Sequence, residues 1–78
     1  MNAHEYTVEF DLNVIGLSAI RRAATKFADR CHAAVELIDN NRARVTLASI
    51  HPFDEPSDVL AGELQNEALD QALREVVV

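Results

Sequence analysis

The sequence predicts one small α+β domain, residues 1–78, folded as a two-layer sandwich with the element order β-α-β-β-α. Two observations predict this fold. Polar and apolar residues alternate in 5–12, and 34–38 and 43–50 are rich in β-branched and apolar residues, which is typical of strands. Two other segments repeat apolar residues every three or four positions, the period of a helix. We expect a three-stranded mixed sheet with both helices on one face.

Residues 5–12 form the first predicted strand because polarity alternates strictly along them. One face is apolar and the other polar: Tyr6, Val8, Phe10 and Leu12 against Glu5, Thr7, Glu9 and Asp11. This alternation indicates a strand with one face on the core and the other in solvent.

A helix is predicted next, with Ser18 as its cap and an end near His32. Its apolar residues keep helical spacing: Ile20, Ala23, Ala24, Phe27, Ala28 and Cys31. Four of the seven basic residues lie on its outer side: Arg21, Arg22, Lys26 and Arg30. Arg22 and Lys26 are four residues apart, so they repel by roughly a few tenths of a kcal/mol. An acidic partner could offset this cost, and so could the acidic carboxyl-terminal helix if it lies alongside.

Residues 34–38 and 43–50 are predicted to pair as a hairpin, because Asn40 and Asn41 between them tolerate turn geometry. We expect a three-residue loop, 40–42, because it pairs Leu37 with Val45 and keeps each face consistent. The connection that follows, 51–56, contains two prolines, and we expect Phe53 to fold back onto the core.

The second helix is predicted from residue 57 to about 76. Its apolar arc covers about half the circumference: Ala61, Leu64, Ala68, Leu69, Ala72, Leu73 and Val76. A helix this apolar usually meets two surfaces, here the sheet and either a second subunit or a binding partner. All of the net charge of −6 comes from residues 54–78, which carry seven acids and one base.

Several classes of function are disfavoured by composition. The acidic balance argues against nucleic acid, whose affinity depends on basic side chains. No apolar run approaches the ~20 residues that span a bilayer, and no signal peptide is evident, so we expect a cytoplasmic protein without membrane contact. Three scattered His and the single Cys31 offer no zinc spacing, and two isolated Gly build no phosphate loop. We therefore expect no metal, no cofactor and no enzymatic activity.

The segment 64–75, LQNEALDQALRE, resembles the carboxyl-terminal signature of the His-Xaa-Ser system protein family, D component. The family ending Asp-x-x-Leu-Arg-Glu is matched by Asp70, Leu73, Arg74 and Glu75, and its preceding turn by Asn66 and Glu67. The strand, helix and hairpin upstream also follow the family layout. The chain departs at Gln71, where the family often has an aromatic residue.

The resemblance implies a non-catalytic accessory protein in the maturation of a ribosomally synthesised peptide, binding the precursor peptide, a radical S-adenosylmethionine enzyme, or both. An extended peptide can add to the edge of a small sheet, which makes such binding physically reasonable. The candidate partner-binding residues are Asn66, Asp70, Arg74, Glu75, Arg22 and Lys26. Asp70 and Arg74 alternatively form an ion pair that only supports the helix. The alternative function is a self-associating homodimer, or a fixed subunit of an enzyme complex.

Overall fold

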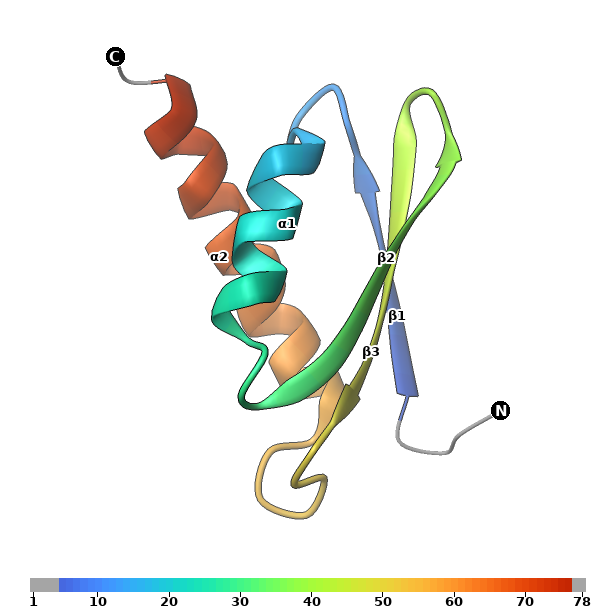
Figure 1. The fold of residues 1–78 in the computed structure, drawn as a ribbon, viewed down its shortest axis with the longest axis vertical. Helices are drawn as coiled ribbons and strands as arrows, with labels where there is room; N and C mark the ends of the chain where they lie inside the picture. The colour runs from blue at the N-terminus through green and yellow to red at the C-terminus, as the bar shows by residue number, and fades with distance from the viewer. Residues whose placement is uncertain (1–4, 77–78) are drawn as a thin grey trace.

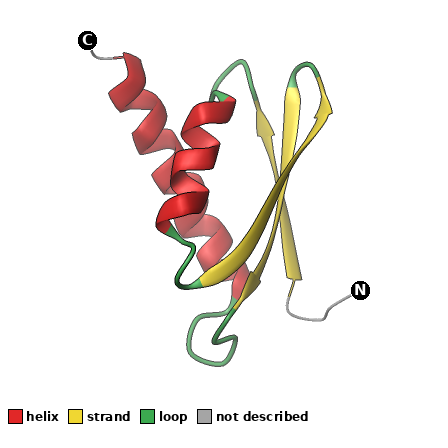
Figure 2. Cartoon of the chain, in the orientation of Figure 1, coloured by secondary structure: helices red, strands yellow, loops and turns green. Residues whose placement is uncertain are grey.

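The computed structural model describes residues 5–76 and contains five elements in the predicted order (Figures 1 and 2). They are β1 (Glu5–Asp11), α1 (Leu17–Lys26), β2 (Cys31–Asp39), β3 (Arg42–Ser49) and α2 (Ser57–Val76). The α+β class and the β-α-β-β-α order are therefore confirmed. Within residues 5–76, neither helix is both long and apolar enough to cross a membrane.

The sheet has the strand order β1-β3-β2, and both of its pairings are antiparallel. The predicted mixed sheet is wrong in this respect. β1 and β2 run in the same direction, but β3 lies between them, so no parallel pair forms. The register places inward residues in rows across the sheet, such as Val8, Val45 and Val35.

The hairpin between β2 and β3 differs from the predicted three-residue loop. Asp39 pairs with Arg42 around a two-residue turn, and an irregularity between Leu37 and Asp39 then shifts the register. Leu37 therefore lies opposite Ala43. The longer loop was predicted so that apolar residues of both strands would share one face. The extra residue in β2 achieves the same alignment with a two-residue turn.

α1 is shorter than predicted, because it ends at Lys26 and residues 31–32 already belong to β2. The backbone N–H of Phe27 donates to the Ala24 carbonyl, three residues earlier, at 3.1 Å. This spacing is that of a 3₁₀ turn, which commonly ends an α-helix. The predicted cap is also wrong. The N-cap position is Gly16, without a side-chain cap bond, and the Ser18 hydroxyl points instead to α2.

The core lies between the sheet and the helices, both of which Figure 1 shows on the same side of the sheet. The buried cluster draws on all five elements: Val8, Phe10, Ile20, Ala23, Phe27, Cys31, Ala43, Val45, Leu47, Leu60, Ala61, Leu64 and Ala68. Phe53 was predicted in this core, but it is 95% exposed. Phe53 lies in a tight turn, in which the backbone N–H groups of Asp54 and Glu55 donate to the His51 carbonyl, and this turn places its side chain in solvent.

Candidate partner-binding surface on the two helices

The basic side of α1 faces the acidic side of α2. The seam between them contains three ion pairs: Arg22 with Glu75 at 3.8 Å, Lys26 with Glu67 at 3.2 Å, and Arg30, just after α1, with Glu63 at 3.1 Å. The like-charge cost predicted within α1 is therefore offset inside the molecule, by the acidic helix lying alongside.

Arg30 is the most connected base of this seam. Its Nε donates to Glu55 at 2.7 Å, its Nη2 donates to Glu63, and its guanidinium lies 5.0 Å from the Phe27 ring centroid. The hydrogen bonds with Glu55 and then Glu63 raise the pKa of Arg30. Sequence reasoning placed Arg30 in the basic cluster but not among the site residues. Its acidic partners lie 25 and 33 residues further along the chain, so no local pattern points to them.

A groove of about 490 Å³ lies over this seam. Its lining includes three of the predicted partner-binding residues: Lys26, Asn66 and Asp70. Glu67, on the same wall, accepts a hydrogen bond from Gln71 Nε2 at 2.7 Å. That bond, followed by the contact with Lys26, lowers the pKa of Glu67.

Of the other predicted site residues, Arg74 and Glu75 lie near the end of α2, and Arg22 lies on α1. Arg74 pairs with Asp70 at 2.9 Å across one helical turn, which confirms the predicted ion pair. Glu75 accepts a hydrogen bond from the Ser18 hydroxyl at 2.8 Å and pairs with Arg22. The structure thus gathers all six candidates on the helical layer, although two come from α1 and four from α2.

The apolar arc of α2 is divided between two environments. Leu60, Leu64 and Ala68 are fully buried in the core. Leu69 and Leu73, one turn apart, are 46% and 60% exposed. The exposed pair is the second apolar surface that the width of the arc predicted.

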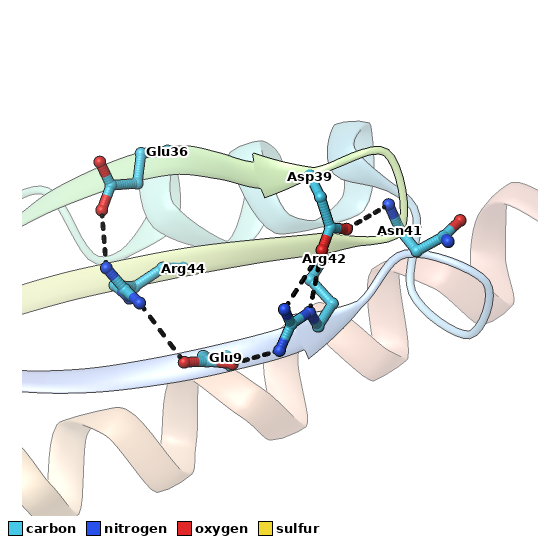
Figure 3. Close-up of polar contacts among 6 residues, drawn as sticks. All are labelled: Glu9, Glu36, Asp39, Asn41, Arg42 and Arg44. Atoms are coloured by element: carbon cyan, nitrogen blue, oxygen red, sulfur yellow. Dashed lines mark hydrogen bonds and ion pairs between the residues drawn. The ribbon is translucent and has the colours of Figure 1, made fainter.

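A second polar network covers the outer face of the sheet, away from the helices (Figure 3). Arg44 on β3 bridges Glu9 on β1, at 3.6 Å, and Glu36 on β2, at 3.3 Å. Arg42 pairs with Asp39 at 3.2 Å and with Glu9 at 3.7 Å. In the hairpin turn the Asn41 backbone N–H donates to Asp39, and this bond is the main reason that the pKa of Asp39 is lowered.

The surroundings of Cys31, the chain's single cysteine, are those of an unreactive thiol. Cys31 is buried, burial raises the pKa of its thiol, and its Sγ–H donates to the Phe27 carbonyl at 3.5 Å. These conditions disfavour the reactive thiolate. Among residues 5–76, no group of three or more His, Cys, Asp and Glu side chains is placed to hold a metal ion. The notable features of the helical layer are its paired charges and exposed leucines.

Comparison with known families decides the classification. The family model for the His-Xaa-Ser system protein HxsD matches residues 10–78. The chain belongs to this family. The match runs from β1 through α2, and it includes all six candidate residues. Searches of curated proteins and of solved structures gave no match. Family membership supports an accessory role within the His-Xaa-Ser system.

Proposed function

We propose that this protein is a non-catalytic accessory component that holds the precursor peptide, the radical S-adenosylmethionine enzyme, or both, during maturation of a ribosomally synthesised peptide. The observation that carries the proposal is the surface of α2 where Leu69 and Leu73 are exposed near Asn66, Asp70 and Arg74. We call these five residues the α2 surface.

The chemistry of the α2 surface suits a protein partner. Protein interfaces combine an apolar centre with a polar rim, and here two leucines adjoin an amide, a carboxylate and a guanidinium. Arg74 uses one nitrogen for Asp70. A guanidinium carries five N–H donors, so Arg74 retains donors that can reach a carboxylate of the partner.

The sheet provides a second means of holding a peptide. The order β1-β3-β2 leaves β1 and β2 as edge strands, and an extended peptide can add to such an edge through main-chain hydrogen bonds. Three acidic residues alternate with other side chains along β1: Glu5, Glu9 and Asp11. An acidic edge favours a neutral or basic extended segment.

Size-exclusion chromatography with light scattering tests this function, with the protein alone, with the precursor peptide and with the enzyme. We expect co-migration with at least one of them. The double variant Leu69→Ala/Leu73→Ala should abolish it and Arg74→Ala should weaken it, because the first removes the apolar centre and the second a rim contact.

Val59→Ala is the matched control. Val59 is also an exposed apolar residue of α2, but it lies ten residues before Leu69, about 15 Å along the helix. It should leave co-migration unchanged. Failure of the protein to co-migrate with either molecule, or an equal loss in the control, would contradict the proposal. Circular dichroism confirms that each variant is folded.

A further inference from the structure

β2 is an edge strand whose regular part has a clear midpoint. The irregularity between Leu37 and Asp39 limits regular pairing to residues 31–37, and Ala34 is the centre of that span. The inward side chains Ala33 and Val35 are only partly buried, and Leu37 is 59% exposed. The helical layer therefore leaves an apolar row partly open along this edge.

The outward side of the same span is self-complementary about its midpoint. His32 and Glu36 stand two residues before and two residues after Ala34, and all three are exposed. Two antiparallel copies of the strand, centred on Ala34, place His32 of each directly opposite Glu36 of the other. The inward residues match in size, because Ala33 then lies opposite Val35.

We propose that β2 pairs antiparallel with β2 of a second copy of this chain, centred on Ala34, to give a continuous six-stranded sheet. The imidazole N–H of His32 donates to the Glu36 carboxylate of the second copy, twice per dimer. Leu37 comes to lie opposite Cys31 of the second copy, which removes its exposed side chain from water. In this register inward residues of one copy face inward residues of the other, so both helical layers lie on the same side of the combined sheet.

Neighbouring registers are less favourable. A pairing centred on Val35 sets Glu36 against Ala34 and leaves His32 facing the irregular end of the strand. A pairing centred on Glu36 sets this carboxylate against its own copy. Like charges directly opposite each other destabilise a strand pair, so the Ala34 register is the favoured one.

The other edge cannot pair with itself in the same way. On β1, a pairing centred on Thr7 opposes Glu5 to Glu9, and one centred on Val8 opposes Glu5 to Asp11. Acidic residues guard an edge strand against self-association, and β1 carries three on its outward side. The second copy therefore occupies β2, and the β1 edge remains for other partners.

The test is light scattering over a concentration series, on the full chain with neither peptide nor enzyme, so it is independent of the proposed function. We expect a concentration-dependent dimer. His32→Glu places two carboxylates opposite each other at both ends of the interface. It should weaken dimerisation by about two- to thirtyfold, since each of the two pairs shifts the free energy by roughly 0.2 to 1 kcal/mol.

Charge exchange then establishes the register. Glu36→Lys should also weaken the dimer, whereas the double variant His32→Glu/Glu36→Lys should restore it, because opposite charges face each other again. Thr7→Glu, the matched control on the outward side of β1, should have no effect. A monomer at all concentrations, no restoration in the double variant, or a dimer that is lost with Leu69→Ala/Leu73→Ala but insensitive to His32→Glu would overturn the proposal.

Discussion

The two charged networks of the molecule differ in what they join. The seam network connects α1 to α2 through residues distant in the chain, and its central base, Arg30, is one-third exposed. The outer-face network connects neighbouring strands that the backbone already holds together, and each of its side chains is more exposed than that of Arg30. Similar ion pairs thus join two helices that meet only through tertiary contacts in one network, and strands already joined by backbone hydrogen bonds in the other.

This difference indicates which region of the molecule contributes more to stability. Ion pairs between exposed side chains contribute little, because water and salt screen them and ordering long side chains costs entropy. The seam network lies at the edge of the packed contact between the two helices. We therefore expect changes at the seam and the core beneath the helices to lower stability more than changes on the outer face of the sheet.

The largest contrast is expected between Leu64 and Thr46. Leu64→Ala removes a fully buried side chain beneath the seam, so it should lower the free energy of unfolding by about 2 to 5 kcal/mol. Thr46→Ala, on the outer face, should change it by only about 0.5 kcal/mol or less. Urea unfolding followed by circular dichroism measures both. Equal losses would show that the outer face contributes as much to stability as the core does.

A smaller contrast is expected between the two bridging arginines. Arg30→Met removes two carboxylate contacts and the stacking on Phe27, so it should lower the melting temperature. Arg44→Met removes two more exposed pairs and should change stability by about 0.5 kcal/mol or less. A double-mutant cycle of Arg30→Met with Glu63→Gln should show coupling, and additivity there would show that the seam pair is unimportant.

Much of the fold follows from the sequence because burial has a local signature. The alternation of 5–12 predicts β1, and the wide arc of α2 predicts a second apolar surface, although it does not say that Leu69 and Leu73 form it. Cys31 shows how this signature can mislead. It continues the helical spacing of α1, yet it lies at the start of β2, because either structure buries it. Periodicity identified a buried position and assigned it to the wrong element.

The site was predicted less completely because its contacts depend on tertiary placement. Asp70 and Arg74 belong to one helix, so spacing alone predicts their ion pair. The contacts of Arg30 require α2 and its preceding loop to be placed beside the end of α1. The register of the hairpin depends on an irregularity in β2 that no sequence pattern predicts.

The smallest expected contrast concerns pH. Hydrogen bonds from Gln71 and Lys26 lower the pKa of Glu67 below its ordinary value of 4.5, so the folded state binds this proton less readily than the unfolded state. The stability that Glu67 contributes is complete above pH 4.5 and is lost as pH falls through the lower pKa of the folded state. Glu67→Gln should therefore reduce the difference in melting temperature between neutral pH and about pH 3.

Asp39→Asn offers the comparison on the outer face, where the pKa of Asp39 is lowered mainly by the Asn41 backbone N–H within one turn. Each variant should reduce the acid sensitivity of the melting temperature by the contribution of the carboxyl that it removes. Lys26→Met should reduce acid sensitivity in the otherwise unchanged protein but not in Glu67→Gln, because Lys26 acts on the protonation of Glu67. Acid sensitivity that persists unchanged in Glu67→Gln would show that the seam does not couple protonation to helix packing.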